Sequence, residues 1–245
     1  MTPGTPRYAV YFAPEADDPW WAFGTRWLGS DPVTGQRLPR LPVEGLPEDT
    51  WERMTQAPRF YGFHATLKPP FALADGCSEA ELVAQARDFC RTRTGFALKG
   101  LAVRFLGRFL ALRPAASAPE IEALASDCVR AFDPLRRPMD PEELQRRAMP
   151  DLDARQRELL HAWGYPYVFD QFRFHLSLTG PLEPRLRERV AAALAERCAP
   201  LSDRPVPVTG ICLFAQPARA VPFRLRWRVR WGGAVEATDA GAGRE

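Results

Sequence analysis

Two segments of this 245-residue chain repeat one pattern, and the repetition restricts the possible folds more than any other feature of the sequence. Residues 60–68 contain the run His-Ala-Thr-Leu beginning at His64, and residues 172–179 contain His-Leu-Ser-Leu beginning at His175. Both segments are rich in aromatic and apolar residues and stop close to a proline, which predicts two β-strands. A chain that carries the same strand twice is predicted to fold as a duplicated unit.

Helices and strands follow the two segments in the same order. A helix of about 15 residues is expected after each segment, and two further strands are expected after each helix. Ser78, with Glu81 three residues later, forms a capping box that predicts where the first of these helices begins. The elements expected in chain order are strand 7–13, a short helix at 19–28, strand 60–68, helix 78–93, strands 96–105 and 109–113, helix 119–132, a helical turn beginning at 141, helix 153–163, strand 172–179, helix 184–198, and strands 206–214 and 223–231.

The order of these elements predicts an α+β fold of duplicated β-α-β-β units, in which two lobes with antiparallel sheets surround a central cleft. The expected parts are one bilobal domain at 1–235, made of lobe one at 7–132 with a loop-dominated insertion at 14–58, a helical insertion at 133–165 and lobe two at 166–231, followed by a flexible Gly- and Ala-rich tail at 232–245. The two histidine strands are expected to face one another across the cleft.

Alternation along a strand predicts what each histidine strand presents to the cleft, because every second side chain points to the same face. Each strand is predicted to place one imidazole, one hydroxyl and one cation on that face. The two sets are His64, Thr66 and Lys68 on the first strand, and Arg173, His175 and Ser177 on the second.

This combination of side chains suits chemistry at a phosphodiester. A neutral imidazole accepts a proton from water or a ribose hydroxyl, while an imidazolium donates one to the leaving oxygen. The hydroxyls of Thr66 and Ser177 are candidates to donate to phosphoryl oxygens, and Lys68 or Arg173 to stabilise the developing charge. No cluster of carboxylates and histidines has metal-ligand spacing, so we expect neither a metal nor another cofactor.

Simpler interpretations remain open for these and neighbouring residues. Two buried structural histidines would explain His64 and His175 without catalysis. The third histidine, His161, ends a predicted helix, where histidines are usually structural. Tyr61 and Tyr167 are candidate substrate-binding residues that would stack on a base, or they are aromatic residues of the core.

Composition limits the kinds of partner and the cellular compartment that we expect for this chain. A net charge of +3 does not by itself require a nucleic acid, and the bias of 31 arginines against two lysines is typical of a GC-rich genome. The five cysteines contain no C-x-x-C pair, so we expect neither a disulfide framework nor a zinc site but a reducing cytoplasm. No stretch approaches the roughly 20 apolar residues of a membrane span, and residues 1–7 lack an export signal. We expect a monomer with no membrane partner.

Two His-x-Thr/Ser motifs on a duplicated α+β fold resemble the 2H phosphoesterase superfamily. Residues 61–68, 163–168 and 172–175 are also similar to the DUF1045 family, which is often described as a phosphonate-metabolism protein because its members are encoded among carbon–phosphorus-lyase genes. The resemblance implies hydrolysis or transesterification of a cyclic or linear phosphodiester. It maps the motif residues onto His64 and Thr66, and onto His175 and Ser177, where serine keeps the hydroxyl of the usual threonine.

The sequence therefore predicts a metal-independent phosphoesterase, a hydrolase that acts on a small phosphodiester in phosphonate metabolism. One alternative is an RNA-end enzyme that opens terminal 2′,3′-cyclic phosphates, for which exposed aromatic residues beside a basic stripe are expected. Another is a non-catalytic module that keeps only the phosphate pocket, and a purely structural role is a fourth hypothesis.

Overall fold

The computed structural model describes residues 4–148 and 150–238, and it confirms the predicted α+β, two-lobed fold. Eight strands form one sheet in the order β10-β9-β8-β1-β2-β6-β5-β4, and every pair of neighbours is antiparallel. Strands β3 and β7 form a separate small sheet. The strands are β1 (Arg7–Phe12), β2 (Ala65–Phe71), β3 (Phe96–Leu98), β4 (Leu101–Leu106), β5 (Phe109–Pro114), β6 (Leu176–Ser177), β7 (Val206–Val208), β8 (Gly210–Gln216), β9 (Arg224–Arg230) and β10 (Val235–Ala237).

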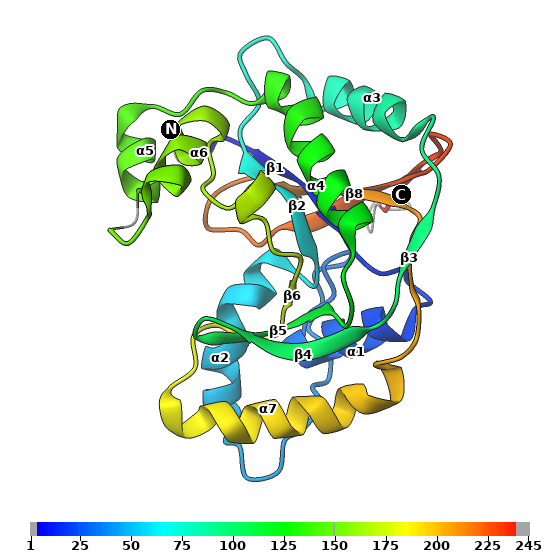
Figure 1. Ribbon diagram of the computed structural model, residues 1–245, viewed down its shortest axis with the longest axis vertical. Helices are drawn as coiled ribbons and strands as arrows, with labels where there is room; N and C mark the ends of the chain where they lie inside the picture. Colours follow the sequence, from blue (N-terminus) through cyan, green and yellow to red (C-terminus); the bar gives the residue numbers. More distant parts are fainter. Residues whose placement is uncertain (1–3, 149, 239–245) are drawn as a thin grey trace, which may run out of the picture.

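Helices cover the two ends of the large sheet, and the helix of each repeat packs against strands of the other repeat. Helices α3 and α4 pack against β2, β8 and β9, whereas α7 packs against β4, so α3 and α7 each cover strands of the opposite repeat (Figure 1). The helices are α1 (Pro19–Leu28), α2 (Glu48–Tyr61), α3 (Glu79–Cys90), α4 (Pro119–Phe132), α5 (Pro141–Arg147), α6 (Ala154–Trp163) and α7 (Pro184–Cys198), with short 3₁₀ turns η1 (Asp133–Leu135), η2 (Phe169–Gln171) and η3 (Ala199–Leu201).

The ends of several helices follow from the local sequence. The predicted capping box is present on α3, where the Ser78 side chain accepts from the Glu81 amide and Glu81 accepts from the Ser78 amide. Asp153 and Gln156 make the same exchange at the start of α6. Helix α6 then ends at Gly164, whose positive φ lets the chain turn without steric strain.

Residues 14–58 were expected to be mainly loop, but they contain a second helix, α2, which runs on to Tyr61. This helix lacks a side-chain N-cap and contains Pro58, so its local signals are weak. It forms because its apolar side packs into the core, where Trp51 and Met54 are buried. As a result, residues 60 and 61, predicted to start the first histidine strand, lie in a helix instead.

Helix α1 supports both histidine segments from behind. Gly24 lies against the ring of Phe63, and a β-carbon at position 24 would lie 2.3 Å from that ring, so only glycine permits the close approach. The indole of Trp27, fully buried, donates to the carbonyl of Leu178 at 2.8 Å. Helix α1 of the insertion therefore helps to position the residue before His64 and the segment after His175.

The two histidine strands differ in length from the prediction. Strand β2 continues through Pro69 and Pro70, whereas β6 consists of only two residues. Strand β6 pairs with β2 at one position, Ala65 with Leu176. Prolines are tolerated further along β2 because the edge of β2 that faces β6 needs no backbone N–H donor there. Residues 172–175, expected to be strand, approach the sheet as irregular chain.

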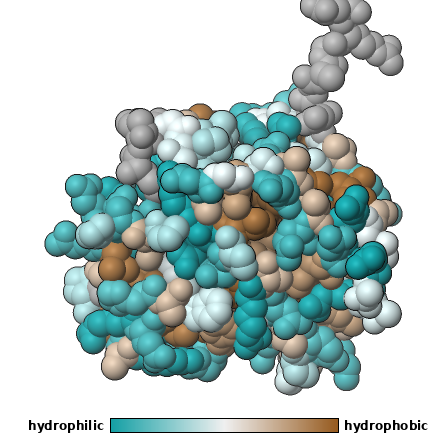
Figure 2. Space-filling view, turned by 90° about the horizontal axis from the view of Figure 1, so that it is seen from above, coloured by the Kyte–Doolittle hydropathy of each residue, from teal (hydrophilic) through white to brown (hydrophobic). Residues whose placement is uncertain are grey.

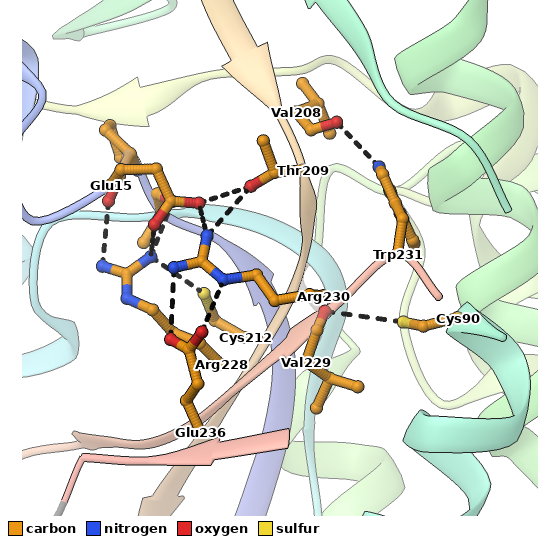
Figure 3. Close-up of polar contacts among 12 residues, drawn as sticks. Glu15, Cys90, Val208, Thr209, Cys212, Arg228, Val229, Arg230, Trp231 and Glu236 are labelled. Atoms are coloured by element: carbon orange, nitrogen blue, oxygen red, sulfur yellow. Dashed lines mark hydrogen bonds and ion pairs between the residues drawn. The ribbon is translucent and has the colours of Figure 1, made fainter. Parts of the chain in front are cut away.

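A buried polar network fixes the chain just after β1. Arg228 of β9 donates to the carbonyls of Ala13 and Pro14. Arg230 and Thr209 bind the carboxylate of Glu15 (Figure 3). These contacts anchor the segment that leads into α1. Beyond β9, strand β10 forms within the segment that the sequence suggested was a flexible tail, and residues 239–245 lie outside the described residues.

No helix in the described ranges combines the length and apolar character that crossing a bilayer requires. The face in Figure 2 is mostly hydrophilic, with apolar side chains in small separate groups.

Candidate active site

The register of the central strands brings the two motifs together. Ala65 pairs with Leu176 in an antiparallel ladder, so Thr66 lies opposite His175 and His64 opposite Ser177. Directly opposed side chains have β-carbons about 4.5–5.5 Å apart on one face of the sheet. The four motif residues thus form a compact square of two imidazoles and two hydroxyls.

His64 is held in one orientation by the backbone and by an aromatic ring. Its Nδ1 lies 2.9 Å from the carbonyl of Gly62, which can only accept, so Nδ1 carries the proton and Nε2 carries the lone pair. Nε2 accepts from the hydroxyl of Thr66 at 3.2 Å. The ring of Tyr11 stacks on the imidazole with centroids 3.7 Å apart. Burial lowers the pKa of His64 to about 3, against the opposing effect of the Gly62 carbonyl, so the ring is neutral at pH 7.

His175 has the same tautomer in a different setting. Its Nδ1 donates to the carbonyl of Arg173 at 2.6 Å, which leaves Nε2 as the lone-pair nitrogen. The ring of Phe109 lies 5.7 Å away in a tilted arrangement. Burial lowers the pKa of His175, and the nearby charge of Arg113 lowers it further. Both imidazoles are therefore neutral with the lone pair on Nε2, and their lowered pKa values make them weak bases where no anion is bound.

Arg113 is a cation of the site that the sequence analysis missed. Strand β5 pairs Ala111 with Ser177 and Leu112 with Leu176, so the next position places Arg113 opposite His175 on the same face. Its Nε is buried, without a hydrogen-bond partner among the described residues. A buried donor without a partner is costly, and an anion beside His175 would satisfy it. Arg113 is the single charged side chain in a run of apolar residues, a signal that becomes meaningful only once the pairing of β5 is known.

A cavity of about 480 Å³ opens beside the second motif. It brings together four of the predicted site residues, Thr66, Tyr167, Arg173 and His175. Residues from three parts of the fold form its wall: the edge of β2, the β4–β5 turn and the segment from α6 to β6. The full lining is Thr66, Leu67, Pro69, Leu106, Gly107, Phe109, Gln156, Tyr165, Tyr167, Val168, Gln171, Phe172, Arg173 and His175.

Aromatic side chains continue from this cavity along the sheet. The ring of Tyr61, at the end of α2, stacks on Phe223 and lies 6.4 Å from the imidazole of His64. Tyr167, 38% exposed, packs edge-on against Tyr165. Burial raises the pKa of Tyr11, so its phenol is neutral. Tyr11, like Arg113, reaches the site only through strand pairing, and no local motif marks it.

Lys68 does not join the site, contrary to the expectation that it shares a face with His64. The pairing of β1 with β2 shifts by one residue between Thr66 and Lys68, and this bulge turns Lys68 away from the motif face. The ammonium, 1% exposed, bonds instead to Asp133 at 3.0 Å and to the carbonyl of Val129 in α4. Lys68 therefore holds β2 to α4.

Arg173 lies beside the cavity, but its guanidinium turns partly back to the chain. It donates to the carbonyls of Asp170 and Phe172, and the side chain is exposed. The structure thus places both motif cations outside direct contact with the imidazoles, and Arg113 is the cation next to His175. Within the ranges that the structure describes, no three metal-ligating side chains lie together.

The fold and the site define a class of protein: an α+β chain whose two histidine–hydroxyl motifs meet beside a cavity. More particularly, the chain belongs to the family described as "Protein of unknown function (DUF1045)", whose model matches residues 66–224. It is 43% identical over 176 residues to a protein of Janthinobacterium sp. (strain Marseille), covering 72% of this chain and 39% of that protein. It is 37% identical over 239 residues to one of Laribacter hongkongensis (strain HLHK9), covering 96% of this chain and 55% of that protein.

Both relatives are named "Ribose 1,5-bisphosphate phosphokinase PhnN", and the chain spans about half of their length or less. These names contradict the predicted hydrolase, because a phosphokinase transfers a phosphoryl group rather than hydrolysing a phosphodiester. The RNA-end phosphodiesterase and the non-catalytic module agree with the names no better. The physical reason for the error is that imidazoles and hydroxyls move protons and bind phosphate in any phosphoryl chemistry. The motif does not specify whether water or a substrate group attacks.

Proposed function

We propose that this chain takes part in phosphoryl transfer to a phosphorylated ribose, by binding the sugar phosphate in the cavity and accepting the proton of the attacking group. One observation carries the proposal: two neutral imidazoles with unprotonated Nε2 atoms directly precede two paired strands, beside Arg113 and a 480 Å³ cavity. The names of the two relatives supply the reaction class and the sugar.

The charges of the site suit an anionic ligand. Arg113 is positioned to donate its unpartnered Nε–H to a phosphoryl oxygen, and the hydroxyl of Ser177 is a further donor. The hydroxyl of Thr66 donates to phosphate when its proton turns away from Nε2 of His64. A phosphate next to the imidazoles raises their pKa values, because the negative charge favours the protonated form. Ligand binding therefore brings His64 and His175 toward the neutral range, in which they are effective acids and bases.

The proposed step transfers the terminal phosphoryl group of a nucleoside triphosphate to the sugar. The acceptor oxygen of the sugar forms a bond to the terminal phosphorus of the donor, while its proton moves to Nε2 of His64. The bond from that phosphorus to the nucleoside diphosphate breaks, and its electron pair stays on the leaving oxygen. Neither lysine of the chain follows a glycine, so the chain would bind the triphosphate without a Gly-Lys phosphate loop.

We further propose that the chain shares ancestry with the 2H superfamily, with its paired motifs used for transfer instead of hydrolysis. The duplicated motifs and the antiparallel two-lobed fold support this relationship. A role in phosphonate metabolism is proposed on the same basis as the reaction class, from the resemblance to DUF1045 and the names of the relatives.

Calorimetry and phosphorus NMR test the proposal on the purified chain. Ribose 1,5-bisphosphate is titrated in two buffers of different ionisation enthalpy, and the same sugar is then incubated with ATP and Mg²⁺. We expect binding with net proton uptake, and transfer of the γ-phosphoryl group to the sugar. The double variant His64→Gln/His175→Gln should lose both the proton uptake and the transfer.

His161→Gln is the matched control, because this third histidine is exposed on α6. It should bind and transfer like the wild type. The wild type failing to bind the sugar phosphate would overturn the proposal, and binding without transfer would overturn its catalytic half.

A further inference from the structure

A group of three arginines lies at the far end of β1 from the histidines. Arg7, the first residue of β1, is on the same face of the sheet as Tyr11, which stacks on His64. Arg7 and Tyr11 are four positions apart, about 13 Å along the strand. Arg147 ends α5, and Arg219 lies in the turn between β8 and β9.

A buried glutamine and a buried glutamate join these arginines into one cluster. Both Nε and Nη2 of Arg7 donate to Oε1 of Gln216, whose Nε2 donates to the carbonyls of Arg219 and Val221. Gln216 is completely buried, so it fixes Arg7 against the turn that carries Arg219. The carboxylate of Glu143, 6% exposed, binds Arg147 at 2.8 Å and Arg219 at 3.6 Å.

The three arginines of the cluster lie within electrostatic range of one another. The hydrogen bonds of Arg7 go to an amide, and the charges of Arg219 and Arg147 lie close enough to lower its pKa, although burial is the larger cause. Arg147 and Arg219 thus share the carboxylate of Glu143, while Arg7 lies within electrostatic range of both and is held by the amide of Gln216. Like charges that are held together in partly buried surroundings favour the binding of an anion, and arginine is the side chain best suited to phosphate oxygens.

Aromatic rings connect this cluster to the histidines. The guanidinium of Arg7 lies over the ring of Phe223, which in turn stacks on Tyr61, the neighbour of His64. Tyr165 lines the cavity that contains His175 and is within electrostatic range of Tyr61 and Arg147. The two ends of this face are therefore joined by a row of aromatic rings, in which Phe223 is buried and Tyr61 and Tyr165 are the partly exposed rings against which a sugar can pack.

We infer that Arg7, Arg147 and Arg219 form a second phosphate subsite, which binds the far phosphate of a bisphosphorylated ribose while the near phosphate lies at the histidine motifs. This inference rests on the proposed function and assigns residues to each end of its substrate. A sugar with one phosphate fills one subsite, and a sugar with two fills both.

Titration calorimetry with ribose 1,5-bisphosphate and ribose 5-phosphate tests the second subsite. For each variant, the dissociation constant of the monophosphate is divided by that of the bisphosphate. The expected change in this ratio is the same whichever subsite the monophosphate prefers. We expect the wild type to bind the bisphosphate about 10- to 100-fold more tightly, the range expected for hydrogen bonds between charged groups. In Arg7→Gln and in Arg219→Gln the ratio should fall to below about threefold.

Arg53→Gln is the control, because Arg53 is an exposed arginine of α2 that pairs with Asp49. It should keep the wild-type ratio, and circular dichroism with thermal melting should show that all variants are folded. An unchanged ratio in folded Arg7→Gln and Arg219→Gln would overturn the second subsite while leaving the proposed function intact. Failure of the wild type to bind either sugar phosphate would instead overturn the proposed function.

Discussion

The two histidine segments carry nearly the same motif, yet the fold treats them differently. His64 directly precedes a seven-residue strand, with its imidazole stacked on Tyr11 and 5.9 Å from the ring of Phe214. His175 precedes a strand of two residues and forms part of the cavity wall. The motif therefore fixes the chemical groups, while the surrounding rings and charges set the proton affinity of each group.

The largest expected effect concerns the two imidazoles themselves. His64→Gln and His175→Gln should each reduce the rate of phosphoryl transfer by about 10²–10⁴-fold, the usual contribution of a positioned acid or base. The rate is measured by phosphorus NMR with ribose 1,5-bisphosphate and ATP. A loss of less than about threefold in one of the variants would show that only one segment takes part in the reaction.

The second prediction separates the cations of the two segments. Asp133→Ala should lower the free energy of unfolding by about 3 kcal/mol, because it leaves the Lys68 ammonium buried without its carboxylate. Arg173→Met, in the second segment, should change it by less than about 0.5 kcal/mol, since Arg173 is exposed. Urea denaturation measures both, and equal effects would contradict the different roles given to Lys68 and Arg173.

The third prediction uses pH. The pKa of His64 is lowered to about 3 in the folded chain, so between about pH 6.5 and 3 the unfolded chain binds more protons. The free energy of unfolding therefore falls as the pH falls through this window, by up to about 1.4 kcal/mol per pH unit from this residue. Above about pH 7.5 His64 is neutral in both states and adds no slope.

Variants of the two histidines show which residue causes the change of unfolding free energy with pH. Denaturation of the wild type, His64→Gln and His175→Gln at pH 7, 6 and 5 should show a shallower slope when His64 is replaced. His175 has a lowered pKa as well, and its replacement should also reduce the slope. If His64→Gln kept the full wild-type slope, the enclosed setting of His64 would be refuted.

The smallest effect is expected from the hydroxyls. Thr66→Val and Ser177→Ala each remove one hydrogen-bond donor to phosphate, which is worth about 0.5–1.5 kcal/mol, or roughly 2- to 12-fold in affinity. Thr66→Ser keeps the hydroxyl and serves as the matched control in the same titrations. An effect of Thr66→Val above about 100-fold would indicate that Thr66 chiefly orients His64, to which it donates.

The sequence by itself determined the local elements and the chemical groups of the site. Capping boxes, proline positions and apolar spacing located helices such as α3 and α7 closely, because these signals act within a few residues. The repeated motif also led to the α+β fold and to the four residues that meet on the paired strands.

Only the tertiary structure decided which side chains meet. A bulge in β2 moves Lys68 out of the site, and the register of β5 brings in Arg113, because one residue of shift in strand pairing changes the face of a side chain. Likewise, Tyr11 and Arg7 come from a strand about 50 residues before the first motif in the sequence, a separation over which local patterns carry no information. The motif left the attacking group unspecified for the same reason, since the substrate is selected by a cavity that distant segments build together.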